Sequence, residues 1–298
     1  MKTGLSAFSS AAGLFLGFAV LLPVAQAETI VEKGAYLTVA GGCLGCHTNT
    51  SEGSQPFAGG RALKTPFGVF YSPNITPDPE NGIGRWNDSE FLAALKKGVS
   101  PSGHPYFPVF PYPSYTKMTD KDALAIKAYL FTLPKASIQD KPHEVSAPLS
   151  WRWLQWGWRA LFFDDEPYSP APNASEKVAR GGYLVEALTH CGECHTPRNS
   201  LGAPDKELYL AGTIDGPDRE IVPNITPDDG TGIGDWSEAD IAGLMKSGML
   251  PDFDNVQGSM AEVIDHSLSK LTDDDLAAIA AYLKSIPAIK NTVAKPKS

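Results

Sequence analysis

The sequence has few of the residues that cross-link proteins or hold bare metal ions. It contains four cysteines in 298 residues, all of them in two segments, residues 43–46 and 191–194. This spacing argues against a disulfide framework spread over the chain. A structural zinc ion needs about four Cys or His ligands, and neither segment has a second pair at a suitable distance. A redox-active C-x-x-C pair would accompany a βαβ pattern, which is not visible.

Basic residues are also scarce, and they do not cluster. The 25 Lys and Arg are outnumbered by 34 Asp and Glu, so the formal net charge is −9. A protein that binds nucleic acid usually carries a basic patch or stripe. The composition therefore argues against a nucleic-acid partner, and it suits a basic protein partner or simple solubility.

Long apolar runs are lacking except near the N-terminus. Residues 1–27 combine the positive start MK, the apolar run AAGLFLGFAVLL and the small residues VAQA. This is the arrangement of a secretory signal peptide, with cleavage expected after Ala27. The alternative is an uncleaved membrane anchor, although the run is short of the roughly 20 residues that span a bilayer. The sequence therefore predicts a periplasmic protein.

What the sequence does contain is a duplication, at an offset of about 150 residues. Six landmarks recur in the same order, which chance does not plausibly explain. The pairs are GAYL (34–37) and GGYL (181–184), CLGCHT and CGECHT, PNITPD (73–78) and PNITPD (223–228), GIGRW and GIGDW, LKKG and LMKSG, and MTDKDALAIKAYL (118–130) and LTDDDLAAIAAYL (271–283). We therefore expect two copies of one domain.

These landmarks predict five segments along the chain. They are the signal peptide (1–27), a first domain (28–135), a tryptophan-rich linker (136–175), a second domain (176–290) and a C-terminal tail (291–298). The two domains are called the first and the second repeat below.

Each repeat is predicted to consist of helices and loops. Thr119 and Thr272 are expected to cap the last helix, because acidic and then helically spaced apolar residues follow them. A shorter helix is expected over residues 86–97 and 236–246, and the first helix carries Gly-x-Tyr-Leu. The loops between them are long for a compact domain. Something other than side chains should therefore fill the centre of each repeat.

The two cysteine motifs offer that filling. C-x-x-C-H is the attachment signature of c-type haem, because two thiols can reach the vinyl groups on one porphyrin edge while the next imidazole reaches the iron. The cysteines predicted to form thioethers are Cys43, Cys46, Cys191 and Cys194. His47 and His195 are the predicted proximal iron ligands. The sequence therefore predicts two covalently bound haem c groups as cofactors.

These features resemble the class I cytochrome c family. The resemblance implies a mainly α fold of two tandem cytochrome c domains, with long Pro/Gly-rich loops around covalently bound haem. More narrowly, PNITPD…GIG.W and G.M.EV…LTD.DL.AIAAYL are similar to the cytochrome c subunits of periplasmic alcohol, aldehyde and sugar dehydrogenases. Those subunits often carry three haems and a C-terminal anchor, whereas this sequence shows two haem motifs and no such anchor.

In that family a methionine sulfur from the loop before the last helix completes the iron coordination. Met260, in GSMAEV, lies at the matching place in the second repeat. The alternative is a methionine that only fills the core. In the first repeat the residue at the same offset is Phe110, so the resemblance gives no sulfur there.

Three interpretations remain for the sixth ligand of the first haem. His104 is ranked first, Met118 second, and an iron left open on that side third. Met118 directly precedes the helix cap, where an apolar residue usually staples the turn. Because the axial ligand is a main determinant of haem potential, we expect the two haems to differ.

The linker concentrates four of the six tryptophans in WRWLQWGWRALFF, residues 151–163. One face of the predicted helix carries Trp151, Leu154, Trp158 and Leu161. One interpretation is an interdomain helix whose Arg152 and Arg159 meet haem propionates. The other is an exposed aromatic anchor for a dehydrogenase or for peripheral contact with a membrane. The PNITPD loops are expected to line the haem edge, and the remaining histidines, 143, 190 and 266, are expected to be surface or local hydrogen-bonding residues.

Two haems on a small scaffold predict single-electron transport between proteins, with the redox chemistry belonging to the cofactor. The expected donor is a periplasmic dehydrogenase, and the expected acceptor is a respiratory cytochrome, an oxidase or a quinone-linked component. The alternative is a dihaem oxidoreductase of the peroxidase or thiosulfate dehydrogenase type, which would act at an open first haem. No acid–base pair typical of a substrate site stands out.

Overall fold

The described part of the chain leaves out most of the first 27 residues and the last five. The computed structural model describes residues 1, 3–4 and 28–293. The expected signal segment therefore lies almost wholly outside the described residues, as does the end of the expected tail. Within the described ranges no helix is both long and apolar enough to cross a membrane.

The first repeat is built mainly from helices. Its elements are α1 (Ile30–Ala40), α2 (Cys43–Cys46), β1 (Ala62–Thr65), β2 (Gly68–Tyr71), α3 (Asp88–Lys97), α4 (Tyr112–Tyr115) and α5 (Asp120–Leu130). Strands β1 and β2 form an antiparallel hairpin that the sequence analysis did not anticipate. The linker then contributes one helix, α6 (Leu154–Phe162).

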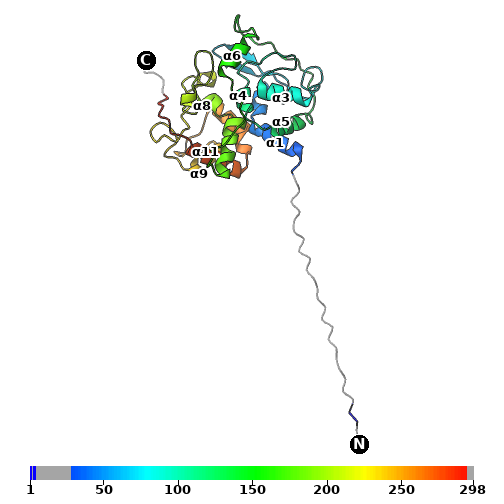
Figure 1. Ribbon diagram of the computed structural model, residues 1–298, viewed down its shortest axis with the longest axis vertical. Helices are drawn as coiled ribbons and strands as arrows, with labels where there is room; N and C mark the ends of the chain where they lie inside the picture. Colours follow the sequence, from blue (N-terminus) through cyan, green and yellow to red (C-terminus); the bar gives the residue numbers. More distant parts are fainter. Residues whose placement is uncertain (2, 5–27, 294–298) are drawn as a thin grey trace.

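The second repeat follows the same order without an equivalent hairpin among its described residues. Its elements are α7 (Glu176–Tyr183), the π-helical η1 (Leu184–Leu188), α8 (Gly192–His195), α9 (Glu238–Ser247), α10 (Gly258–His266), α11 (Asp273–Ser285) and the single turns η2 (Lys206–Leu208), η3 (Pro217–Arg219) and η4 (Leu268–Lys270). In Figure 1, α1, α3 and α5 gather on one side, α8, α9 and α11 on the other, and α6 at the top. The mainly α fold predicted from the sequence is thus confirmed.

In each repeat the first helix packs closely against the last. Gly34 of α1 makes this contact in the first repeat, where a Cβ atom would lie 1.9 Å from the carbonyl oxygen of Ala125. Gly181 of α7 stands in the same relation to Ala278, again at 1.9 Å. No larger side chain fits between the helices at these points. The glycine of each Gly-x-Tyr-Leu motif is therefore required by the helix crossing.

The predicted helix caps are confirmed as well. Thr119 and Thr272 each accept a hydrogen bond from the backbone N–H three residues later, in the N-cap position. Helices α3 and α9 begin two residues after Trp86 and Trp236 and end close to the expected positions.

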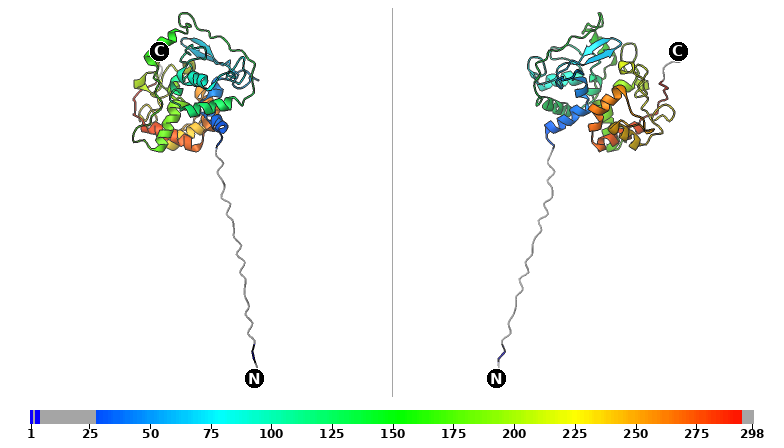
Figure 2. Two further views of the ribbon diagram at one scale, coloured as in Figure 1. Left: turned by 45° about the vertical axis from the view of Figure 1, so that its right-hand side comes forward. Right: turned by 180° about the vertical axis from the view of Figure 1, so that it is seen from behind.

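The two repeats face each other with reciprocal contacts. The Tyr36 hydroxyl of α1 donates to Asp275 of α11 at 2.6 Å, and the Tyr183 hydroxyl of α7 donates to Asp122 of α5 at 2.6 Å. One continuous cluster of buried apolar side chains runs through both repeats and includes Leu37, Met118, Leu184 and Leu276. Figure 2 shows the halves side by side from two further directions. The repeats thus share one core and are related by an approximate two-fold arrangement.

Candidate haem-attachment sites

The first cysteine motif lies on the turn that follows α1. Gly42 has a left-handed backbone, with φ of 64°, and it turns the chain directly into α2. In a helix, residues three apart share a face, so Cys43 and Cys46 are presented on the same side of this single turn. The His47 N–H donates to the Cys43 carbonyl at 2.8 Å and closes the turn that connects the two cysteines to the histidine.

Both motif histidines are oriented by the same partner. His47 Nδ1 lies 2.8 Å from the carbonyl oxygen of Pro73, and His195 Nδ1 lies 2.8 Å from that of Pro223. A carbonyl can only accept, so Nδ1 carries the proton in both rings. The Nε2 lone pair is then left for a metal, as in many protein sites where a carbonyl fixes a histidine ligand.

The electrostatic surroundings keep both imidazoles neutral. Burial lowers the pKa of His47 and of His195, and the hydrogen bond to the proline carbonyl opposes that shift without reversing it. Only the neutral ring offers a lone pair to a metal. The side chains are therefore in the form that an iron ligand requires.

The PNITPD loops hold these carbonyls in place through their asparagines. The Asn74 side-chain amide donates to the carbonyls of Ala136 and Ile138 at 2.7 and 3.0 Å, and its oxygen accepts from the N–H and hydroxyl of Thr76 at 2.9 and 2.7 Å. In the second repeat, the Asn224 side-chain oxygen likewise accepts from the N–H and the hydroxyl of Thr226, both at 2.8 Å. The chain itself therefore satisfies the polar atoms of these side chains. The loops act by positioning the proline carbonyl.

The four cysteines form no disulfide. Burial, together with the neighbouring Cys46, raises the pKa of Cys43 to about 12. Burial and the charge of Glu193 raise the pKa of Cys194 to about 12. Within the described residues, no group of three or more His, Cys, Asp or Glu side chains could hold a bare metal ion. Paired thiols and a single oriented imidazole in each repeat fit a covalently attached haem.

The candidate sixth ligands occupy very different surroundings. Met260 lies on α10, not in a loop as expected, and is half-buried against the shared core. Met118 is fully buried, at 0% exposure. His104 is exposed in a tight turn, where its backbone exchanges hydrogen bonds with Ser100. Phe110, at the offset of Met260, packs half-buried on the core.

His190 is the residue that sequence reasoning missed. It was expected at the surface or in local hydrogen bonds, but its ring meets the Tyr115 ring of the other repeat edge-on, with centroids 5.5 Å apart. It also lies beside Gly42, where a Cβ atom would come within 3.9 Å of His190 Nε2. The one sequence feature that pointed to His190 was its position directly before Cys191.

Helix α6 and the residues just before it join the repeats through polar contacts. Arg152 Nε donates to the Pro105 carbonyl at 2.8 Å, Arg159 donates to the Lys97 carbonyl, and Trp158 Nε1 donates to the Leu201 carbonyl at 3.0 Å. Both guanidinium groups also lie over aromatic rings of the first repeat. The arginines thus bind protein carbonyls and rings, which differs from the expected propionate contacts. The predicted interdomain helix is present, although Trp151 precedes it.

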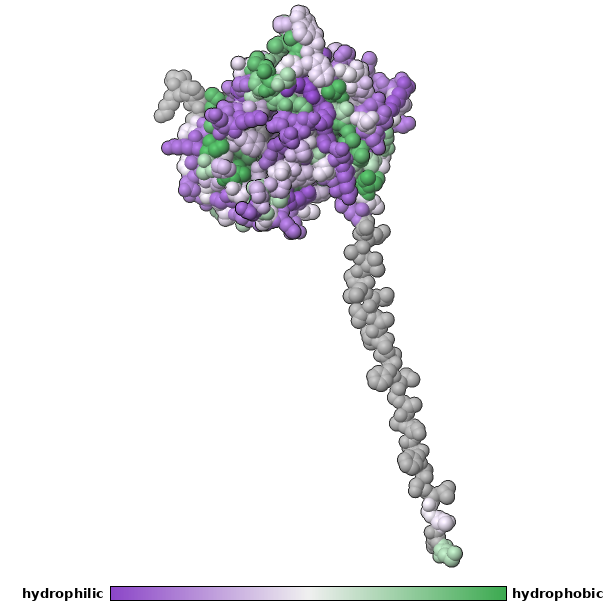
Figure 3. Space-filling view, viewed as in Figure 1, coloured by the Kyte–Doolittle hydropathy of each residue, from purple (hydrophilic) through white to green (hydrophobic). Residues whose placement is uncertain are grey.

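The same segment exposes much apolar surface. Trp153 and Leu161 are 64% and 72% exposed, and Trp151 and Trp156 are close to half exposed. The Trp151 and Trp153 rings stack at 6.1 Å with an interplanar angle of 19°. Figure 3 shows apolar side chains gathered at the end of the molecule where α6 lies. Residues 151, 153, 156 and 161 are called the tryptophan surface below.

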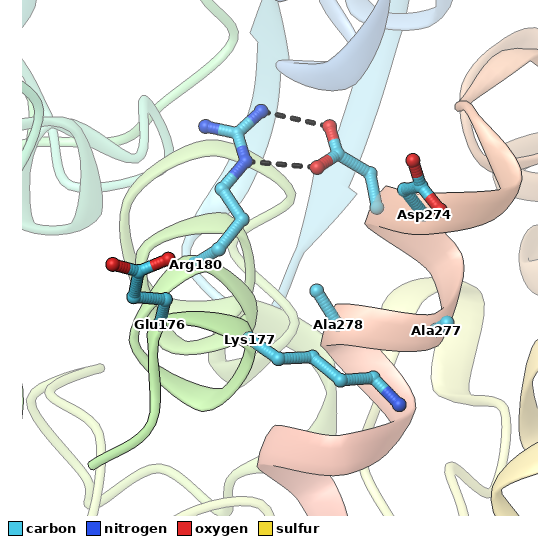
Figure 4. Close-up of a pocket in the computed structure, with 7 residues that line it drawn as sticks. Glu176, Lys177, Arg180, Asp274, Ala277 and Ala278 are labelled. Atoms are coloured by element: carbon cyan, nitrogen blue, oxygen red, sulfur yellow. Dashed lines mark hydrogen bonds and ion pairs between the residues drawn. The ribbon is translucent and has the colours of Figure 1, made fainter.

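One hollow lies between two helices of the second repeat. This shallow pocket, between α7 and α11, is lined by residues that include Arg180 and Asp275 (Figure 4). The two side chains form a bidentate ion pair with N–O distances of 2.8 and 2.7 Å. These groups satisfy each other. The pocket is therefore part of the helix packing.

Comparisons with known proteins agree with this geometry. The cytochrome c family model matches residues 31–134 and 178–287. A dihaem cytochrome c-type protein of Cereibacter sphaeroides is 43% identical over 262 residues, which are 87% of this chain and 86% of that protein. The alcohol dehydrogenase (quinone) cytochrome c subunit of Komagataeibacter europaeus is 41% identical over 95% of this chain and 61% of the subunit. The fructose dehydrogenase cytochrome subunit of Gluconobacter japonicus is 40% identical over 89% and 54%.

The chain thus spans between about half and two thirds of the length of these dehydrogenase subunits, and nearly all of the dihaem relative. The family match falls on both repeats, and in each it includes the thiol pair and the carbonyl-bound histidine. The chain therefore belongs to the cytochrome c family, with two covalently bound haem c groups as its cofactors.

Proposed function

We propose that this chain is a periplasmic dihaem cytochrome that takes single electrons from a dehydrogenase and passes them towards the respiratory chain. His47 and His195 are the proposed proximal ligands, and Met260 is the proposed sixth ligand of the second haem. The observation that carries the proposal is the duplicated bond from His Nδ1 to a proline carbonyl behind each C-x-x-C-H motif. Haem iron supplies reversible one-electron chemistry when bound, and the chain fixes its orientation.

A dehydrogenase partner is supported by the relatives. Three of them are named as cytochrome subunits of alcohol, gluconate and fructose dehydrogenases. Such a partner needs a docking face, and the tryptophan surface carries three exposed tryptophan side chains. Exposed patches of this kind mark protein–protein or membrane contacts. We place the dehydrogenase there, and a peripheral membrane contact is the other outcome to be tested.

Purification from the native cells tests the proposal. The dehydrogenase that copurifies is identified by mass spectrometry, and its alcohol or sugar substrate is then added. We expect haem reduction in the wild-type complex and loss of the complex in a Trp151→Ser/Trp153→Ser variant. Phe131→Ser serves as the control, since it removes an exposed aromatic side chain from the end of α5.

Two results would contradict the proposal. Haem that stays oxidised with the copurified enzyme and its substrate would contradict electron transfer. A double variant that keeps the dehydrogenase but no longer binds vesicles of native lipid would assign the tryptophan surface to a membrane.

A second candidate is a dihaem oxidoreductase acting at the first haem. The observation that favours it is Phe110, which stands where a methionine is expected. The ferric spectrum separates the two functions. A high-spin first haem that binds cyanide readily would favour the enzyme, whereas two low-spin haems favour the carrier.

A further inference from the structure

The two haem-attachment motifs approach each other across the repeat interface. The Gly41 carbonyl, two residues before Cys43, accepts a hydrogen bond from the Tyr115 hydroxyl at 2.8 Å. The Tyr115 ring in turn contacts the ring of His190, at an interplanar angle of 83°. His190 is covalently next to Cys191. A single imidazole thus lies between the residues that introduce the two motifs.

The contact with Tyr115 places His190 in the interface between the repeats. Burial there lowers the pKa of His190, and the charge of Glu193 acts in the opposite direction without reversing the shift. The His190 ring contacts Tyr115, whose hydroxyl donates to the Gly41 carbonyl. These two contacts connect Cys191 to the Gly41–Cys43 segment.

The backbone indicates that this imidazole is held there under strain. His190 and Gly42 occupy equivalent positions, each directly before the first cysteine of its motif, and both have left-handed backbones, with φ of 41° and 64°. Glycine adopts this conformation freely, whereas histidine does so with strain. Strain of this kind tends to persist at functional sites.

The equivalent position in the first repeat lies beside this ring. A Cβ atom at Gly42 would lie 3.9 Å from His190 Nε2, which is ordinary van der Waals contact. Only the second repeat has a ring directly before its first cysteine, so a single imidazole lies at this place in the interface.

We propose that His190 is the bridge through which electrons pass between the two haem-attachment motifs, along Cys191–His190–Tyr115–Gly41–Gly42–Cys43. This inference rests on the proposed electron-transfer function. One electron crosses in each event, so that one motif's site is oxidised and the other is reduced. No proton moves, and His190 is unchanged.

Pulse radiolysis of the full holoprotein tests this bridge, because it delivers electrons without any partner protein. The relaxation between the two sites is followed by visible absorption in His190→Gly, His190→Phe and wild type. Glycine suits the left-handed backbone, as Gly42 shows, while phenylalanine keeps an aromatic ring against Tyr115. We expect His190→Gly to slow the relaxation several-fold and His190→Phe to recover most of the rate.

His143→Gly is the matched control, since its ring packs on Phe70 and Phe107 within the first repeat. It should leave the rate unchanged. Midpoint potentials and haem content are measured in every variant, so that a change in driving force is recognised. A His190→Gly rate equal to wild type would overturn the bridge, and so would loss of the second haem, which would assign His190 to haem attachment. Failure of a dehydrogenase to reduce the wild type would contradict the proposed function alone.

Discussion

The Tyr36 hydroxyl of the first repeat donates to Asp275 of the second at 2.6 Å, while Arg180 holds the same carboxylate through two nitrogens. The opposite arrangement occurs at Asp122, which binds the Tyr183 hydroxyl and the Lys33 ammonium group. Each carboxylate therefore receives a tyrosine from the other repeat and a cation from its own. This exchange joins the two haem domains into one unit.

Removing one tyrosine hydroxyl that binds across the interface should lower the stability of both domains together. We expect Tyr36→Phe to lower the free energy of unfolding by about 1.5–3 kcal/mol, the usual range for a hydrogen bond to a charged group. Urea unfolding followed by tryptophan fluorescence measures it. Tyr71→Phe, which removes a more exposed hydroxyl bond to Glu144, should cost less. Equal losses in the two variants would contradict a special role for the interface.

Acid should loosen the same interface. Burial raises the pKa of Asp275, but hydrogen bonds from Arg180 and Tyr36 outweigh it, and the net pKa is lowered. The pKa of Asp122 is lowered likewise, because hydrogen bonds from Lys33 and Tyr183 outweigh the effect of burial. Stability from these carboxylates is present above the unfolded Asp pKa of about 3.9 and is lost as the pH falls through the folded values.

Urea midpoints at pH 5.5, 4 and 3 test this dependence. Asp275→Asn should be less stable than wild type at pH 5.5 and should lose less stability on acidification. Asp273→Asn, on the same helix turn with a side chain 90% exposed, should behave like wild type. If the stability of Asp275→Asn depended on pH as strongly as that of wild type, other groups would control the loss of stability in acid.

The sixth ligands can be separated by three alanine variants. Met260→Ala should abolish the long-wavelength sulfur-to-iron absorption band of the ferric second haem. If Met118 ligates the first haem, Met118→Ala should remove a second such band, and it should also cost about 2–5 kcal/mol of stability as a buried truncation. His104→Ala should change the first haem's spectrum only if His104 binds iron, since its exposed turn predicts little effect on stability. A band that survives Met260→Ala would contradict the proposed ligand.

The side chain of Asn224, in the second PNITPD loop, is expected to stabilise the fold. Asn224 makes four hydrogen bonds through its side chain, two as donor and two as acceptor. Asn224→Ala leaves buried partners unsatisfied, so we expect a loss of at least about 2 kcal/mol. Thermal unfolding measures it, with the exposed Asn255→Ala as the control. An unchanged melting temperature would contradict the view that this loop is held by its asparagine.

Features with local causes were predictable from the sequence. A Thr followed by acidic residues favours a helix start through local bonds, so Thr119 and Thr272 were located correctly. The glycine in each Gly-x-Tyr-Leu motif was recognised through its repetition, although its reason, the helix contact at Ala125 or Ala278, appears only in the fold.

Features with non-local causes were missed. The β1–β2 hairpin has only four residues in each strand, and Val69 gains two further backbone bonds to Glu144, far along the chain. Met260 was expected in a loop because the family resemblance places the methionine there, and α10 has no side-chain cap that would have signalled its start. His190 could not be placed beside Gly42 before the two repeats were seen to face each other.

Intact-mass spectrometry of the denatured mature protein tests the central claim most directly. The account predicts the mass of the polypeptide plus two haem groups, because thioether bonds at Cys43, Cys46, Cys191 and Cys194 survive denaturation. A mass equal to the bare polypeptide, or to the polypeptide with one haem, would contradict it.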